Sequence, residues 1–315
     1  MNLLRLKNFC LVILMIGYGV RGVAFEITEI GICQINGIEY PAVGFGTYPL
    51  KDEVCLKAVL QAAETGYRII DTATFYRNFD PISKALKKYG RENFYIISKV
   101  WPDAHSPELL LEDIKSTLKQ LQTPYLDAYL LHWPNSKVPV EDTLMMMEKL
   151  RTQGIIHDIG LSNVNINHLK RAMEVTIPIS WVQVEMHPQF YDEELLEFCR
   201  ENNIKVQAWA PLGRGLISND IFLTELGKKY GKTASQIAIR WIIQHNCIPL
   251  PGSKNKQHML ENIDVMDFAL SQDEMLAINE RAKLGARERV THEAGVGFTD
   301  EFDFSYQQCW PKPIK

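Results

Sequence analysis

The stretch that decides the fold reads Gly66-Tyr67-Arg68-Ile69-Ile70-Asp71-Thr72-Ala73. Two later stretches have the same layout and read Phe94-Tyr95-Ile96-Ile97-Ser98-Lys99 and Leu126-Asp127-Ala128-Tyr129-Leu130-Leu131-His132-Trp133-Pro134. Each contains an apolar run of strand length that closes on an ionisable residue, namely Asp71, Lys99 or His132. In a parallel barrel, chemistry lies at the C-terminal ends of the strands. We therefore expect these side chains to meet at one mouth, together with Tyr76 in the loop after the first stretch.

Strand-like and helix-like segments alternate along the rest of the chain. Further apolar strands are expected at about 43–45, 156–161, 181–183, 205–209 and 248–250. Amphipathic helices fit between the strands, for example at 53–65, 107–121, 140–153, 192–202 and 233–244. This alternation predicts an α/β fold, a closed (β/α)8 TIM barrel. A doubly wound sheet is the alternative, but no Gly-x-Gly-x-x-Gly turn follows the first strand.

The segments at the two ends of the barrel sequence are also distinctive. Residues 32–41 read as a β-hairpin that turns at Asn36-Gly37, a strong hairpin signal. We expect this hairpin to precede the barrel and close one end of it. The tail at 286–315 reads as an irregular loop, expected to lie over the barrel mouth. Residues 25–315 are therefore predicted to form a single barrel domain.

The first residues have the layout of a secretory signal peptide. Arg5 and Lys7 precede an apolar run at 9–16, and small residues at 22–24 offer a cleavage site. Residues 1–24 are predicted to be this signal, so the protein is expected to be exported; a cytoplasmic protein with an uncleaved extension is the alternative. The apolar run is too short to span a bilayer comfortably, so no membrane span is expected after signal removal.

Composition excludes several classes of partner. The 315 residues are 46% hydrophobic and 23% charged, which is typical of a globular protein with a substantial core. A net charge of −4 offers no general attraction to nucleic acid. The eight histidines include no His-x-His pair at a strand end, which argues against a metal-dependent barrel hydrolase, and no metal is expected. A monomer is the default expectation for a self-contained barrel.

The residues at the strand ends fit proton transfer to a carbonyl. A free phenol has a pKa of about 10, and the ammonium of Lys99 is expected to lower that of Tyr76. Asp71 would hold Lys99 charged, and His132 would donate a hydrogen bond to a substrate oxygen. Each residue alone also fits an ordinary structural role, but their joint occurrence at successive strand ends favours catalysis. No side chain supplies hydride, so a nicotinamide cofactor is expected.

Several segments resemble the signatures of the aldo-keto reductase family. Residues 66–78, which end in Thr74-Phe75-Tyr76-Arg77-Asn78, resemble the first signature. Ser98-Lys99-Val100-Trp101 and Leu131-His132-Trp133-Pro134 resemble the lysine and histidine segments, and Ile159-Gly160-Leu161-Ser162-Asn163 resembles the Gly-x-Ser-Asn strand end. The resemblance runs from about residue 34 to at least residue 267. It implies Tyr76 as general acid, Lys99 and Asp71 as residues that tune it, and His132 as the residue that orients the substrate.

The same resemblance implies NADP(H) bound across the barrel mouth. Ser162, Asn163 and Gln183 match the residues that hold the carboxamide, and Trp209 matches the aromatic that stacks on the nicotinamide. The loop from Leu212 would clasp the pyrophosphate. The full set of implied cofactor contacts is Gly46, Thr47, Asp71, Ser162, Asn163, Gln183, Trp209, Leu212, Gly213, Arg214, Ser253, Lys254, Glu261 and Asn262.

The adenosine end departs from the family pattern. Ser253 and Lys254 are expected to bind a 2′-phosphate. However, Gly252 stands where many members have lysine, and His258 where many have arginine. A neutral imidazole is a weaker phosphate partner than a guanidinium. NADP(H) is therefore the first choice of cofactor, with NAD(H) as the alternative.

Together these features predict an NAD(P)H-dependent oxidoreductase that reduces aldehydes or ketones to alcohols. Its partner would be a small-molecule carbonyl substrate. The side chains expected to line the substrate pocket are Tyr48, Tyr76, Trp101, His132 and Trp133. The alternative is a nicotinamide-binding regulatory or sensor barrel with little or no turnover.

Overall fold

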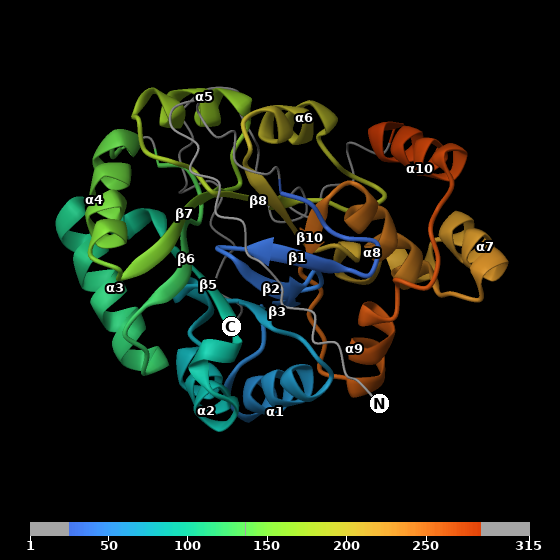
Figure 1. The fold of residues 1–315 in the computed structure, drawn as a ribbon, viewed down its shortest axis with the longest axis horizontal. Helices are drawn as coiled ribbons and strands as arrows, with labels where there is room; N and C mark the ends of the chain where they lie inside the picture. Colours follow the sequence, from blue (N-terminus) through green and yellow to red (C-terminus); the bar gives the residue numbers. More distant parts are fainter. Residues whose placement is uncertain (1–24, 136, 285–315) are drawn as a thin grey trace, which may run out of the picture.

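The computed structural model describes residues 25–135 and 137–284 (Figure 1). The predicted signal segment at 1–24 and the predicted tail loop at 286–315 lie outside the described residues, so both remain predictions. Within the described ranges, no helix is both long enough and apolar enough to cross a membrane.

Eight parallel strands form the centre of the molecule, ordered β3 to β10 around a curled sheet. The strands are β3 (Phe45–Gly46), β4 (Ile69–Asp71), β5 (Tyr95–Val100), β6 (Leu126–Leu131), β7 (Ile156–Ser162), β8 (Trp181–Glu185), β9 (Lys205–Trp209) and β10 (Cys247–Pro249). The predicted (β/α)8 barrel is confirmed, and the doubly wound alternative is wrong.

The barrel closes along a short seam between β3 and β10. The Gly44 N–H donates to the Pro249 carbonyl at 3.0 Å, and the Gly46 N–H donates to the Pro251 carbonyl at 3.1 Å. The two chains come unusually close here, because a Cβ placed on Gly252 would lie 2.6 Å from the Gly46 carbonyl oxygen. Glycine is therefore required at this seam for steric reasons.

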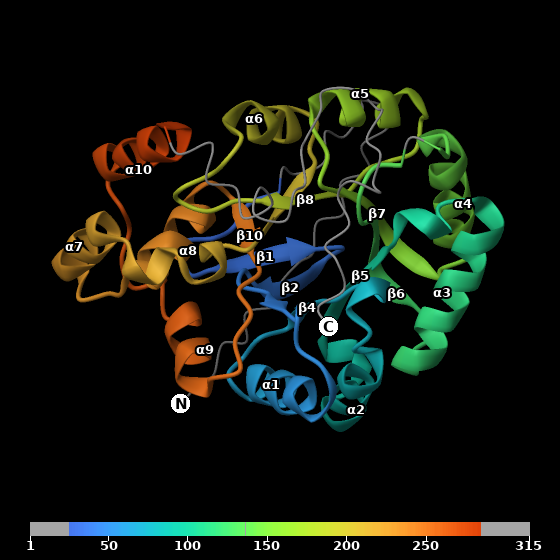
Figure 2. The same ribbon diagram turned by 180° about the vertical axis from the view of Figure 1, so that it is seen from behind.

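Helices surround the strands, as the two end-on views show (Figures 1 and 2). They are α1 (Asp52–Glu64), α2 (Phe79–Tyr89), α3 (Pro107–Leu121), α4 (Val140–Thr152), α5 (Ile166–Glu174), α6 (Glu193–Glu201), α7 (Ile221–Tyr230), α8 (Ala234–Gln244), α9 (Lys256–Ile263) and α10 (Gln272–Leu284). Capping residues mark the N-termini of several of these helices. Ser106 accepts a hydrogen bond from the Leu109 N–H with proline as the first helical residue of α3, and Thr233 and Gln236 form a reciprocal cap at α8.

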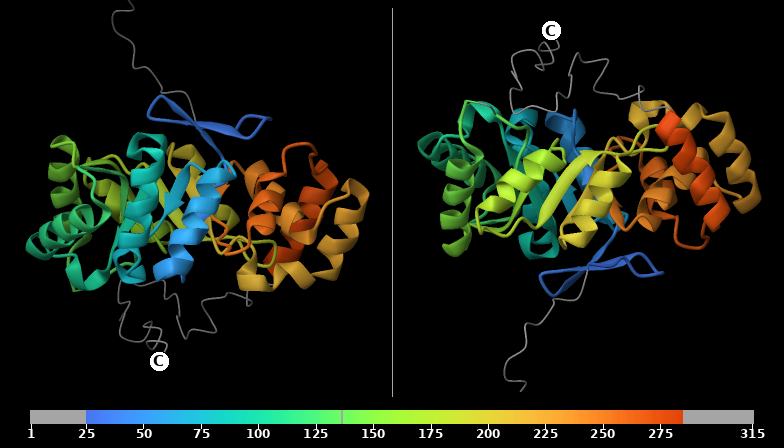
Figure 3. Two further views of the ribbon diagram at one scale, coloured as in Figure 1. Left: turned by 90° about the horizontal axis from the view of Figure 1, so that it is seen from below. Right: turned by 90° about the horizontal axis from the view of Figure 1, so that it is seen from above.

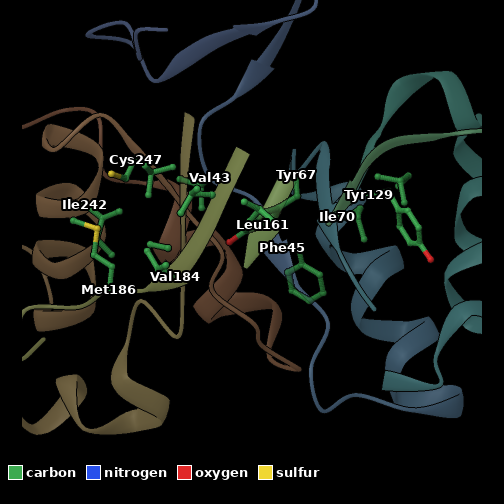
Figure 4. Packing of buried hydrophobic residues seen from close by; sticks show 14 of the residues in the cluster. Val43, Phe45, Tyr67, Ile70, Tyr129, Leu161, Val184, Met186, Ile242 and Cys247 are labelled. Carbon is green, nitrogen blue, oxygen red and sulfur yellow. The ribbon is translucent and has the colours of Figure 1, made fainter. Parts of the chain in front are cut away.

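The main core lies between the barrel and the helices. Figure 4 shows buried side chains that pack there, including Phe45, Tyr67 and Ile70 on one side and Val184 and Ile242 on the other. Because both faces of each central strand are covered, the strands read in the sequence as nearly continuous apolar runs. This is why their positions were predictable.

The N-terminal hairpin closes the end of the barrel opposite the C-terminal strand ends (Figure 3). It consists of β1 (Ile32–Ile35) and β2 (Ile38–Pro41), and its turn residues Asn36 and Gly37 both have positive φ, as a two-residue I′ turn requires. The predicted hairpin is therefore confirmed. Its side chains pack on barrel residues such as Tyr95 and Trp181.

A polar network that is buried except at Asn36 joins the hairpin to the barrel. The Asn36 side chain donates to Asp158 Oδ2 at 2.9 Å, and the Tyr95 hydroxyl donates to the same oxygen at 2.6 Å. The Trp181 indole N–H in turn donates to the Tyr95 hydroxyl at 2.7 Å. The hairpin thus covers the N-terminal end of the barrel, whereas active sites in barrels of this kind lie at the C-terminal ends of the strands.

Candidate active site

The four predicted catalytic side chains lie together at the C-terminal ends of adjacent strands. Asp71 ends β4, Lys99 lies near the end of β5, and His132 follows β6 directly. Tyr76 ends the short 3-10 turn η1 (Thr74–Tyr76) after β4. The Lys99 Nζ lies 2.6 Å from Asp71 Oδ1 and 3.2 Å from the Tyr76 hydroxyl. The Tyr76 and His132 ring centroids are 5.6 Å apart.

A buried asparagine supports the backbone around this group. Asn78 accepts a hydrogen bond from the Thr72 hydroxyl at 2.7 Å and donates to Thr47 Oγ1 at 3.0 Å and to the Leu50 carbonyl at 3.1 Å. The Thr47 hydroxyl donates to the Asp71 carbonyl at 2.8 Å. These bonds join the loop after β3 to the loop that carries Tyr76. Thr47, predicted to approach the cofactor, is thus a buried support behind the site.

A second support comes from helix α3. Asp113 Oδ1 accepts hydrogen bonds from the hydroxyls of Thr74, at 3.1 Å, and of Tyr129 on β6. Burial raises the pKa of Asp113, although its hydroxyl partners oppose this. Asp113 lies in the middle of an amphipathic helix, where an aspartate gives no sequence signal of a role at the site.

The pKa of Tyr76 runs against the sequence-based expectation. Burial raises this pKa well above its ordinary value, and the nearby Asp71 carboxylate raises it further. The expected net lowering of the Tyr76 pKa is therefore wrong, because burial and the Asp71 charge outweigh the neighbouring ammonium of Lys99. The physical reason is that Asp71 neutralises the ammonium at 2.6 Å, while burial also lowers the pKa of Lys99 itself. Tyr76 consequently stays protonated at neutral pH.

His132 is neutral under the same conditions. Burial lowers its pKa well below the ordinary value, and the charges of Lys99 and His105 act in the same direction. Its Nδ1 atom is buried without a hydrogen-bond partner in the described part of the chain. A neutral imidazole can donate a hydrogen bond from a single N–H but is a poor source of a proton at neutral pH.

Asp71, Tyr76 and His132 line a cleft of about 980 Å³ that extends from Trp101 to helix α9. The predicted site residues that line it are Gly46, Tyr48, Asp71, Tyr76, Trp101, His132, Trp133, Ser162, Asn163, Gln183, Trp209, Leu212, Arg214, Ser253, Glu261 and Asn262. Of the other predicted residues, Thr47, Lys99 and Gly213 are buried and do not line the cleft. Lys254 is exposed and does not line it either.

Two of the predicted carboxamide contacts are already engaged with the protein. Asn163 donates to the His132 carbonyl at 2.8 Å and accepts from the Trp209 indole N–H at 2.9 Å. Gln183 donates from its side-chain nitrogen to Asp71 Oδ1 and Gln207 Oε1, both at 2.8 Å. Asn163 therefore fixes the half-buried Trp209 ring, a supporting role that the sequence did not indicate.

The cleft also has lining residues that the sequence-based prediction missed. Phe75 stacks on Trp101 with ring centroids 4.3 Å apart, and Thr233, Ala234 and Ser235 lie at the start of α8. The Thr-x-x-Gln cap could have located this helix start. Backbone N–H groups at a helix N-terminus suit a phosphate. A flat indole and a helix N-terminus along one groove fit a nicotinamide dinucleotide.

Within the described ranges, no group of three or more His, Cys, Asp or Glu side chains is arranged to hold a metal ion.

Comparison with known proteins identifies the family. The model of the aldo/keto reductase family matches residues 42–283. The chain is 35% identical to the glyoxal reductase of Bacillus subtilis over 257 residues, which cover 79% of this chain and 93% of that protein. It is also 35% identical to the methylglyoxal reductase DkgA of Escherichia coli over 265 residues, which cover 81% of this chain and 93% of that protein.

Solved structures of similar proteins point to the same family. An aldose reductase of Schistosoma japonicum matches with a TM-score of 0.74 at 33% identity, over 80% of this chain and 91% of that one. An aldo-keto reductase of Bombyx mori in complex with NADP matches with a TM-score of 0.73 at 32% identity, over 79% and 92% of the two chains. The sequence resemblance is thus confirmed, and this chain belongs to the aldo/keto reductase family.

Proposed function

We propose that this protein is an NAD(P)H-dependent oxidoreductase that reduces aldehyde or ketone carbonyls to alcohols, with Tyr76 as the general acid. The observation that carries the proposal is the Tyr76 hydroxyl, 3.2 Å from Lys99 Nζ and beside a neutral His132 in the cleft. The names of the similar glyoxal and methylglyoxal reductases support carbonyl reduction.

Proton transfer follows from the side chains themselves. When bound, a nicotinamide cofactor supplies hydride to the carbonyl carbon. Tyr76 donates its proton to the carbonyl oxygen, so hydride and proton together yield the alcohol. Lys99 then stabilises the phenolate that Tyr76 becomes, since its ammonium lies within hydrogen-bond distance. His132 cannot replace Tyr76 as the acid because its lowered pKa leaves it neutral, but its N–H can orient the substrate oxygen.

The cofactor would lie along the groove from Tyr76 to α9. Trp209 offers a flat surface for the pyridine ring, and the start of α8 offers backbone N–H groups to a phosphate. NADP(H) is the first candidate, since the similar Bombyx mori enzyme was solved with NADP. NAD(H) is the alternative, because among the described residues that line the α9 end of the cleft there is neither lysine nor arginine.

The proposal is tested by titrating the protein with NADPH and NADH while recording tryptophan fluorescence, followed by assays with a panel of aldehydes and ketones. Cofactor binding with turnover is expected. Binding without any turnover would favour the regulatory or sensor alternative.

The role of Tyr76 is tested by Tyr76→Phe, which is expected to bind cofactor normally and to lose about 10²- to 10⁴-fold in kcat. Tyr48→Phe is the matched variant, because the Tyr48 ring lies in the same cleft with its centroid 5.1 Å from that of Tyr76. It is expected to lose far less activity. Equal losses in the two variants would exclude Tyr76 as the specific proton donor.

A further inference from the structure

Arg214 lies in the part of the cleft that holds Tyr48 and Tyr76. It follows β9 in the turn η4 (Gly213–Gly215) and lines the same cleft as Tyr48 and Tyr76. Its guanidinium carbon is 5.9 Å from the centroid of the Tyr48 ring, and the Tyr48 and Tyr76 centroids are 5.1 Å apart. A cation at this distance is attracted to the ring face, so Tyr48 holds the guanidinium near the proton donor.

The charge of Arg214 is not neutralised by the protein. Among the described residues, the charged side chains that line the cleft are Asp71, Arg214 and Glu261. Asp71 is paired with Lys99 at 2.6 Å. No hydrogen bond or ion pair joins the Arg214 guanidinium to another group of the described ranges, and its ring contact is with Tyr48. Its planar fork of N–H donors is therefore available to an incoming anion.

The backbone holds Arg214 in an unfavourable conformation. Its φ is 51° and its ψ is 34°, in the left-handed region that few residues other than glycine adopt. The flanking Gly213 and Gly215 also have positive φ, at 54° and 105°. Residues in such sparsely populated backbone conformations cluster at active sites and ligand clamps.

We propose that Arg214 binds a carboxylate of the substrate, so that the preferred substrates are carbonyl compounds that carry a carboxylate group. This inference rests on the proposed carbonyl reduction. The aromatic walls of the pocket would hold the body of such a molecule while Tyr76 and His132 meet its carbonyl oxygen and Arg214 meets its acid group.

A second anion competes for this role, namely the pyrophosphate of the cofactor, which the sequence resemblance assigns to the loop of Arg214. The position of the guanidinium favours the substrate, because it lies over Tyr48, next to Tyr76. The start of α8 offers a separate set of backbone donors to phosphate along the same cleft.

The test uses 4-carboxybenzaldehyde and its methyl ester, which share an aldehyde and differ in charge. In Arg214→Gln, the ratio of kcat/KM for the acid over the ester is expected to fall by about 10- to 100-fold, through KM, with Arg214→Lys intermediate. Lys51→Gln is the control, because Lys51 is exposed, lies close to Tyr48 in the sequence and does not line the cleft. It should leave the ratio unchanged.

The cofactor dissociation constant, measured by fluorescence, shows whether Arg214 binds the substrate carboxylate or the cofactor pyrophosphate. An unchanged acid-to-ester ratio overturns the proposal, and a weakened cofactor affinity with that unchanged ratio assigns Arg214 to the pyrophosphate instead. If the native protein reduces no carbonyl at all, the proposed function fails. The inference is then decided by titration with benzoate, which should bind the native protein more tightly than Arg214→Gln; equal binding overturns it.

Discussion

The hydroxyl of Thr74 donates a hydrogen bond to Asp113 Oδ1 at 3.1 Å, which ties the turn that carries Tyr76 to the middle of helix α3. The Tyr129 hydroxyl donates to the same oxygen, and the Thr117 hydroxyl lies 3.5 Å from it. Asp113 does not line the cleft. The position of the proposed acid therefore depends on a carboxylate outside the site.

Thr74→Val should lower kcat by about 10- to 100-fold while cofactor affinity stays the same, because small displacements of a reacting group are costly. Steady-state kinetics and fluorescence titration measure the two effects. Thr117→Val is the matched control, since it removes a hydroxyl from the same carboxylate oxygen without touching the turn. Asp113→Asn keeps an acceptor oxygen and should retain more activity than Asp113→Leu. Equal kcat in Thr74→Val and Thr117→Val would contradict this positioning role.

Lys99→Met should destabilise the protein by about 3 to 5 kcal/mol, because it leaves the Asp71 carboxylate buried without its ion-pair partner. Urea unfolding measures this loss. The double variant Lys99→Met with Asp71→Asn removes both charges, so much of the free energy of unfolding should return while turnover stays low. If the double variant were as unstable as the single one, the loss would come from packing rather than from the unpaired charge.

Stability should fall in mild acid because of buried histidine. Burial lowers the pKa of His105 to about 4, whereas an unfolded histidine has a pKa of about 6.5. Between these values the unfolded chain binds more protons, so the free energy of unfolding decreases as pH falls through this window. His105 alone should contribute about 2 kcal/mol of loss between about pH 7 and about pH 5.

Urea unfolding at several pH values measures this slope, to which the lowered pKa of His132 adds in the same direction. His105→Asn preserves a side-chain donor for the Val100 carbonyl but cannot take up the proton, so its slope should be shallower. An unchanged slope in this variant would show that other groups govern the acid response.

Tyr95→Phe should cost about 2 to 4 kcal/mol, because it removes a donor to Asp158 and the acceptor of the Trp181 indole N–H. Thermal or urea unfolding measures the loss. Tyr40→Phe is the matched control, since the Tyr40 ring packs edge-on against Tyr95 with centroids 5.6 Å apart. A similar loss in both variants would mean that ring packing, rather than the polar network, fastens the hairpin.

The sequence predicted those parts of the fold that follow from local pattern. The Asn36-Gly37 turn was predictable because positive φ at both residues strongly favours these residue types. Helices α1, α3, α4, α6 and α8 have bounds within a residue of the predicted ranges, since each carries a clear apolar stripe. Helices such as α5 and α9, with nine and eight residues, were not among the predicted ranges, although α6 is no longer than α5.

The candidate site was predictable where the chain order places polar residues at strand ends, as for Asp71, Lys99 and His132. What could not be predicted depends on contacts between distant segments. Asp113 reaches the site across the fold, and its sequence neighbours give no sign of this. The direction of the Tyr76 pKa shift depends on burial, which a sequence does not measure.

The seam between β3 and β10 has a consequence for how ligands affect the whole molecule. Gly46 and Gly252 both line the cleft, and the backbone bonds from Gly44 and Gly46 hold this joint shut. A molecule bound in the cleft therefore contacts the same backbone segments that close the barrel. Ligand binding in the cleft should both slow amide hydrogen exchange at these glycines and raise the melting temperature. A methyl group at Gly252 should weaken the joint between β3 and β10 and lower ligand affinity as well.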